Sequence, residues 1–278
     1  MRLNDKELDL SVPQVMAIVN ITPDSFFEQS RVVDDEAIET RIRQVVAEGA
    51  SIIDIGGYSS RPGACDVEAE EEWERVRRAL AVVRRVAEDM PVSVDTFRAS
   101  VAERAIGEFG AVIINDISAG ETDAAMWDVV ARYGVPYVAM HMRGTPQSMA
   151  SMADYSDGVV QVVVRYFEQR TMLLRERGIE HIILDPGFGF AKSVEQNYEL
   201  LAGLNTICNM GYHVLAGVSR KSMIYKVLDT TPAEALNGTT ALHWEALRQG
   251  ATILRAHDVC EAIEVVKLYN TYKKRLPK

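Results

Sequence analysis

Apolar and polar positions divide the chain into alternating short and long segments. Between the short apolar runs, apolar residues recur at steps of three and four, the spacing of one helix face, as in Trp73, Val76, Leu80, Val83 and Ala87. Each short run has the length of a strand rather than of a helix. The eight runs are Val15–Val19, Ile52–Ile55, Val92–Val94, Val112–Ile114, Tyr137–Met140, Ile182–Leu184, Val214–Val218 and Thr252–Leu254.

This alternation predicts the fold class. Strand–helix units that repeat eight times, without a linker or a composition shift, are typical of an α/β (β/α)8 TIM barrel. We therefore predict a single barrel domain over residues 1–278. A doubly wound open sheet uses the same units and is the alternative, but eight units in a chain of this length favour the closed barrel. Two helices are expected over 154–177 and from Thr231-Pro-Ala-Glu234, which has the pattern of an N-cap, a first-turn proline and a capping-box glutamate.

Composition and charge exclude several classes of protein. The 30 basic and 40 acidic residues give a net charge of -10, which argues against a nucleic-acid partner. No apolar run approaches the roughly 18 residues of a membrane span, and Met1–Asp9 lacks the apolar core of a signal peptide. Cys65, Cys208 and Cys260 are odd in number and far apart, which excludes a disulfide scaffold and a cysteine-based zinc site. A reducing, cytoplasmic location is therefore expected.

The residues that end the predicted strands carry the candidate chemistry, because a barrel places its active site at these ends. All eight ends are polar. Aspartate and asparagine are also common helix N-caps, so Asp95 and Asp116 have a purely structural alternative. The ends are Asn20, Asp54 with Gly56-Gly57, Asp95, Asn115-Asp116, His141, Asp185, Ser219-Arg220-Lys221, and Arg255 with His257.

These groups divide into two chemical sets. The first can hydrogen-bond a flat heterocycle and contains Asp95, Asn115, Asp185 and Lys221. The second resembles an anion site, because arginines make paired contacts to phosphate oxygens, and asparagine can offer an oxygen to Mg²⁺. It contains Asn20, Arg61, Ser219, Arg220, Arg255 and His257. For Arg255 and His257 a helix-start salt bridge is the alternative. Two long loops, Ile21–Asp34 and Tyr58–Ala69, have the length of lids at a barrel mouth.

Nine motifs in the same order resemble the dihydropteroate synthases over nearly the whole chain. They are Asn20-Ile-Thr-Pro-Asp-Ser-Phe26, Asp54-Ile-Gly-Gly57, Ser59-Ser-Arg-Pro-Gly63, Ser93-Val-Asp-Thr96, Asn115-Asp-Ile117, Met140-His-Met142 with Gly144-Thr-Pro146, Asp185-Pro-Gly-Phe-Gly-Phe190, Ser219-Arg-Lys-Ser222 and Arg255-Ala-His-Asp258. The resemblance implies a transferase of folate biosynthesis on a (β/α)8 barrel. Such an enzyme joins 4-aminobenzoate to a dihydropterin methyl diphosphate and releases diphosphate.

The resemblance also implies roles for individual residues. Asn20 matches the Mg²⁺ ligand, and the catalytic set is Arg61, Lys221, Arg255 and His257. The substrate-binding set is Ser60, Asp95, Asn115, Met140, Asp185, Phe190, Lys221, Ser222, Arg255 and His257, of which Phe190, Lys221 and Ser222 match the aminobenzoate pocket. A homodimer and inhibition by sulfonamides, which mimic aminobenzoate, are further implications.

The chain departs from the family pattern in three places. Phe26-Phe-Glu-Gln-Ser30 replaces Phe-Ser-Asp-Gly-Gly, so Glu28 stands at the loop aspartate and two glycines are lost. Tyr58-Ser-Ser-Arg61 replaces Glu-Ser-Thr-Arg, and Ala191 replaces a glycine. These changes touch loops and leave the strand-end residues whole.

Two other functions remain open at this point. A methyltransferase acting on methyl-tetrahydrofolate could share the Asp–Asn–Asp ring site, but it expels no diphosphate and has no need of Arg255, His257 and a metal ligand at Asn20. A catalytically silent pterin-binding paralogue is supported only by the altered loops. Diphosphate release with both substrates and Mg²⁺ would separate these alternatives from the synthase.

Overall fold

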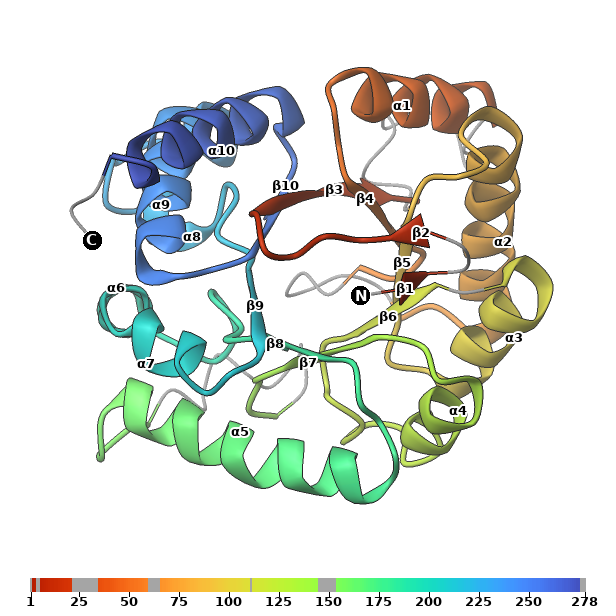
Figure 1. The fold of residues 1–278 in the computed structure, drawn as a ribbon, viewed down its shortest axis with the longest axis horizontal. Helices are drawn as coiled ribbons and strands as arrows, with labels where there is room; N and C mark the ends of the chain where they lie inside the picture. The colour runs from red at the N-terminus through yellow and green to blue at the C-terminus, as the bar shows by residue number, and fades with distance from the viewer. Residues whose placement is uncertain are drawn as a thin grey trace.

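The computed structural model describes residues 2–3, 6–21, 35–59, 66–110, 112–144 and 154–275. Eight parallel strands form a closed barrel in the order β10-β3-β4-β5-β6-β7-β8-β9 (Figure 1). The strands are β3 Gln14–Asn20, β4 Ile52–Gly56, β5 Val92–Asp95, β6 Ile113–Asp116, β7 Tyr137–Met140, β8 Ile182–Asp185, β9 His213–Ala216 and β10 Ile253–Ala256. The last strand pairs with the first, with Arg255 opposite Met16. The (β/α)8 prediction is confirmed, and the open sheet is excluded.

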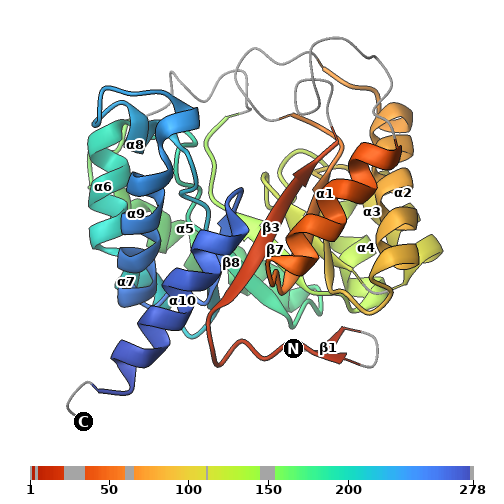
Figure 2. The ribbon, with the colours of Figure 1, turned by 90° about the horizontal axis from the view of Figure 1, so that it is seen from above.

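Helices surround the barrel and cover its outer face (Figures 1 and 2). The predicted stripe on α2 is buried at Trp73, Val76, Leu80 and Val83. No helix in the described part of the chain is both long and apolar enough to cross a membrane. The helices are α1 Asp35–Ala47, α2 Ala69–Val86, α3 Ala99–Phe109, α4 Met126–Tyr133, α5 Val159–Glu176, α6 Val194–Ala202, α7 Leu204–Cys208, α8 Ser222–Tyr225, η3 Pro232–Glu234 (a 3-10 turn), α9 Leu236–Gln249 and α10 Val259–Lys273.

Two predicted helix starts are wrong by a few residues. Helix α5 begins after Gly158, whose φ of +83° is incompatible with a helical position, and the residues before it form a turn. At Thr231 the hydroxyl donates to Glu234 Oε2 at 3.0 Å and caps no amide, so only the short turn η3 forms before α9. The chain has a true capping box at Ser193, which begins α6.

The floor of the barrel is closed by the N-terminal segment, which no sequence pattern predicted. Strands β1 (Arg2–Leu3) and β2 (Lys6–Glu7) form an antiparallel pair below the barrel (Figure 2). Leu8 and Leu10 then pack into a buried cluster inside the barrel. Their partners in this cluster are Met16, Ile52, Ile113, Val138, Ile183, Leu215 and Ile253.

Leu10→Ala tests this floor. The side chain is 3% exposed, so its removal should lower the free energy of unfolding by about 2–5 kcal/mol, measured by urea denaturation. Val12→Ala, at a position that is 44% exposed, is the matched control and should change it by about 0.5 kcal/mol or less. Equal stability of the two variants would show that the segment does not seal the barrel.

Candidate active site

The barrel interior changes from apolar to polar one step above the floor. Side chains two residues apart on a strand point to the same side, so the residue two positions after each floor residue also points inward. Because the strands are parallel, these side chains form a layer facing the C-terminal mouth. Four floor isoleucines are followed in this way by polar residues: Ile52 by Asp54, Ile113 by Asn115, Ile183 by Asp185, and Ile253 by Arg255.

Arg255 joins two carboxylates across the polar layer. Its Nε donates to Asp54 Oδ2 at 2.6 Å, and its Nη2 donates to Asp95 Oδ2 at 2.7 Å. Asn115 Nδ2 donates to the same Asp54 oxygen at 3.2 Å. Asp54 was not among the predicted site residues, although its position two residues after Ile52 already indicated an inward-facing side chain. Arg255 therefore makes no helix-start salt bridge, which was its structural alternative.

Burial and neighbouring charge shift the pKa values of this group. Burial raises the pKa of Asp95 to about 7, against the opposing effect of Arg255 and with support from the nearby Asp54 carboxylate. Burial disfavours the charge on Arg255, but Asp54 and Asp95 outweigh it and raise the pKa of the guanidinium above its usual value. Arg255 is thus a permanent cation at the centre of the mouth.

Asp185 and Lys221 lie on the other side of the layer, against the glycine-rich loop 185–192. Asp185 Oδ1 accepts a hydrogen bond from Gly187 N at 2.8 Å, and burial raises the pKa of this carboxyl while Lys221 opposes the shift. Burial lowers the pKa of Lys221 to about 8. A Cβ on Gly217 would lie 3.9 Å from Asp185 Oδ2 and 4.0 Å from Lys221 Nζ, so the two groups flank this glycine.

An apolar wall stands beside Lys221. The Lys221 ammonium donates to the carbonyl of Phe188 and lies 4.5 Å from the ring centroid of Phe190. Phe190 packs against a small buried cluster that includes Met140. Ser222 follows Lys221 as the first residue of α8. A flat ring therefore finds an aromatic face, a sulfur-containing side chain and a cation in one corner of the mouth.

The predicted anion set is brought together only in part. The Ser219 hydroxyl lies 3.0 Å from His257 Nδ1 and accepts from His257 N at 3.1 Å. Asn20 Oδ1 borders the mouth, 3.2 Å from where a Cβ on Gly56 would stand. Ser60 and Arg61, together with Glu28, lie outside the described residues.

Arg220 does not join the anion set. Its guanidinium donates to Asp258 at 2.7 and 2.8 Å and to the carbonyl of Pro232 at 2.8 Å. This pairing places the helix-start salt bridge at Arg220 rather than at Arg255. The guanidinium therefore anchors the turn η3 to the start of α10.

Asp116 and Tyr58 make contacts that stabilise the fold around the mouth. Asp116 accepts from the amides of Ser118 and Gly120, each at 2.8 Å, and from the hydroxyl of Tyr137 at 2.7 Å. Asp116 therefore has a structural role, although it holds the turn after β6 and does not cap a helix. Tyr58, at the position where the family has a glutamate, packs edge-on against Phe97, with ring centroids 5.0 Å apart.

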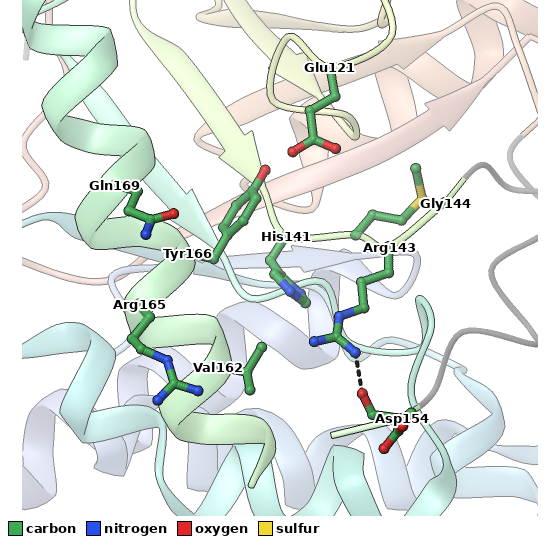
Figure 3. Close-up of a pocket in the computed structure, with 10 residues that line it drawn as sticks. Glu121, His141, Arg143, Gly144, Asp154, Val162, Arg165, Tyr166 and Gln169 are labelled. Carbon is green, nitrogen blue, oxygen red and sulfur yellow. Dashed lines mark hydrogen bonds between the residues drawn. The ribbon is translucent and has the colours of Figure 1, made fainter. Parts of the chain in front are cut away.

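His141 also lies behind the mouth rather than in it. A separate pocket of about 680 Å³ lies between α5 and the segment that follows β7 (Figure 3). His141 forms part of its wall, with its ring edge-on to Tyr166 at a centroid distance of 4.9 Å. The pocket is lined by Glu121, His141, Met142, Arg143, Gly144, Asp154, Val162, Arg165, Tyr166 and Gln169, so none of the polar layer contributes to it.

Comparison with known proteins agrees with this geometry. The family described as pterin binding enzyme matches residues 16–257. A dihydropteroate synthase of Haemophilus influenzae is 41% identical over 268 residues, which cover 96% of each chain. The crystal structure of the Yersinia pestis dihydropteroate synthase with a sulfonamide drug has a TM-score of 0.92 at 34% identity and covers 99% of both chains. The Xanthomonas albilineans dihydropteroate synthase with 4-aminobenzoic acid has a TM-score of 0.88 at 38% identity, covering 97% of this chain and 96% of that one.

The identity extends over nearly the full length of both chains, and the fold agrees throughout. We conclude that this chain belongs to the dihydropteroate synthases of the pterin binding enzyme family, transferases that form 7,8-dihydropteroate in folate biosynthesis.

Proposed function

We propose that the polar layer of the barrel is the pterin site of this synthase. The observation that carries the proposal is the convergence of Asp95, Asn115, Asp185 and Lys221 on one mouth, above a closed apolar floor. Carboxylates accept the N–H donors of the pterin ring, the Asn115 amide both donates and accepts, and the Lys221 ammonium donates to ring acceptors. Asp54 supports this site by holding Asn115 and Arg255.

The diphosphate is proposed to bind along Arg255, His257 and Ser219, with Arg61 from the second loop. Asn20 fits a Mg²⁺ ligand because its Oδ1 is a neutral oxygen that borders the mouth, and Mg²⁺ usually takes few protein ligands and completes its shell with phosphate and water. Among the described residues, no group of three or more His, Cys, Asp or Glu side chains could form a protein-only cage. When bound, the ion would supply positive charge to the departing diphosphate.

The 4-aminobenzoate is proposed to occupy the corner formed by Phe190, Lys221 and Ser222, with Met140 in the adjoining cluster and Ser60 from the second loop. The ring of Phe190 offers an aromatic face, and Lys221 lies above that face. Sulfonamides, as mimics of aminobenzoate, are proposed to compete for this corner. The Yersinia pestis and Xanthomonas albilineans enzymes were solved with a sulfonamide drug and with 4-aminobenzoic acid, which supports binding of both kinds of molecule by this chain.

The charges of Arg255 and of the aspartates account for the proposed transfer reaction. The bond from the exocyclic methylene carbon to the diphosphate oxygen breaks, and the electron pair leaves with the oxygen. Arg255, a fixed cation in a buried site, stabilises the charge that develops there without having to reorganise. The aspartates keep the pterin electron-rich, so that it spreads the positive charge on the methylene carbon. The amine nitrogen attacks this carbon and gives up its proton to water or to the released diphosphate. A dissociative path suits this site, because no residue of the polar layer is an obvious strong base for activating the amine.

Asp185→Asn tests the pterin site. The amide presents the wrong donor pattern to the ring N–H groups, at a cost of about 1–3 kcal/mol, or roughly 5- to 150-fold in Kd. Calorimetry with a pterin that lacks the diphosphate measures this change in Kd. Asp116→Asn is the matched control, because this aspartate also ends a strand but holds the turn after β6. The control should lower the free energy of unfolding and leave the Kd for the pterin unchanged. Unaltered affinity in Asp185→Asn would remove Asp185 from the site.

Chelation tests the metal. EDTA should abolish turnover and added Mg²⁺ should restore it, because Asn20 alone provides too few ligands and the substrate must complete the shell. Asn20→Ala should raise the Mg²⁺ concentration needed for half-maximal rate. Binding of a pterin without diphosphate is the control and should be unaffected by EDTA. Full turnover after thorough chelation would contradict the proposal.

The protein is also proposed to form a homodimer. A cytoplasmic location is proposed from its cysteine usage. Helices α8, α9 and α10 lie side by side on one flank of the barrel (Figures 1 and 2). Val227 and Leu228 after α8, with Leu268 and Tyr272 on α10, are 46–64% exposed and form what we term the α8–α10 patch. Exposed apolar groups gathered on one flank support an interface there.

Leu268→Glu tests the α8–α10 patch. A charge placed in an apolar interface carries a large desolvation cost, so light scattering after gel filtration should show a shift from dimer to monomer. Met172→Glu on α5, at a side chain that is 55% exposed, is the matched control and should remain dimeric. A dimer that survives Leu268→Glu but not Met172→Glu would move the interface to α5.

A further inference from the structure

Lys192 ends the glycine-rich loop, and neither the sequence nor the proposed mechanism gave it a role. Its Nζ donates to the carbonyl of Gly187 at 2.9 Å and to the carbonyl of Phe190 at 3.0 Å. The same nitrogen lies 3.1 Å from His141 Nδ1. An ammonium has three N–H donors, and here three acceptors match them. The side chain thus fastens two carbonyls of the loop to the end of β7.

His141 is held so that it can accept this hydrogen bond. The side chain is 2% exposed, and its ring stands edge-on to Tyr166 of α5 (Figure 3). Burial, with the nearby charges of Lys192 and Arg143, lowers the pKa of His141 well below its usual value. The imidazole is therefore neutral. Because an ammonium can only donate, the contact with Lys192 assigns Nδ1 as the acceptor and the proton to Nε2.

Loop 185–192 and the end of β7 touch closely at the same place. His141 N donates to Asp185 O at 2.9 Å. Gly187 has a φ of +70°, and a Cβ there would lie 2.0 Å from His141 O, so only glycine permits this approach. The Lys192 contacts thus act on a loop that is already in backbone contact with β7.

The same loop sets the position of both pterin-facing charges. Gly187 N donates to Asp185 Oδ1, while Gly187 O accepts from Lys192. Lys221 rests on the carbonyl of Phe188 and on the ring of Phe190. A displacement of the loop would therefore move Asp185 and Lys221 together.

We propose that Lys192 is a positioning residue of the pterin site, which holds loop 185–192 against His141 so that Asp185 and Lys221 face the mouth. This inference rests on the proposed roles of Asp185 and Lys221. It predicts that loss of the ammonium weakens pterin binding more than the accompanying loss of stability explains.

Lys192→Met tests this inference in the full-length protein. It keeps most of the apolar stem and removes the ammonium, and it should weaken binding of a pterin without diphosphate at least tenfold by calorimetry. Lys192→Arg retains the charge and the donors and should recover much of that affinity. Val83→Ala, a buried position on α2, which packs against α1, α3 and β4, is the stability control: it should lower the melting temperature and leave Kd unchanged.

Asp185→Asn distinguishes a failure of the proposed pterin site from a failure of the proposed role of Lys192. Unchanged pterin affinity in that variant would remove Asp185 from the proposed site, on which this inference rests. Weakened affinity in Asp185→Asn with wild-type affinity in Lys192→Met would overturn the role of Lys192 alone. If Lys192→Met does not fold, His141→Asn and His141→Ala decide: the asparagine oxygen can replace Nδ1 as acceptor, so the asparagine variant should bind more tightly than the alanine variant. Equal affinity of that pair would overturn the inference.

Discussion

The ion group of Arg255, Asp54 and Asp95 is the interaction on which the mouth of the barrel depends. Removing an ion from water costs several kcal/mol even after relaxation, so a fully buried carboxylate such as Asp54 requires donors. Arg255 and Asn115 supply them from β10 and β6. Two carboxylates share one guanidinium, which leaves the group with excess acceptors. A ligand rich in N–H groups complements such a site.

The charged residues near the mouth fall into two groups, which differ in their hydrogen-bond partners. Arg220 and Asp116 form hydrogen bonds with backbone groups outside the mouth, and Arg220 also pairs with the Asp258 carboxylate. Asp95, Asp185 and Lys221 combine burial with shifted pKa values and face the interior. Perturbed titratable groups gathered in a cleft are typical of functional sites. Here the physical cause is common to all three, because the polar layer lies directly above a dry apolar floor.

Ala191 shows how a departure from the family pattern is tolerated. Its φ of +49° lies in the left-handed region, where a Cβ costs about 1–2 kcal/mol. The methyl group is 3% exposed and packs in the cluster with Met140 and Met142. Burial of one such group contributes about 0.8 kcal/mol. The two effects are of similar size, so alanine can replace glycine here while the turn into Lys192 is kept.

The barrel and its strand ends can be predicted from the amino-acid sequence, because both follow from local periodicity: runs of strand length, helical stripes between them, and polar residues where each strand stops. Which of these polar ends face the mouth depends on contacts between strands that are distant in the chain. Asp54 became the centre of the polar layer, while Arg220, Asp116 and His141 have their partners elsewhere: Asp258 at the start of α10, Tyr137 on β7 and Tyr166 on α5. The floor residues Leu8 and Leu10 were likewise invisible to pattern, since their partners come from all around the barrel. Periodicity fixes the side of a strand on which a residue lies, whereas its hydrogen-bond partners depend on segments distant in the chain.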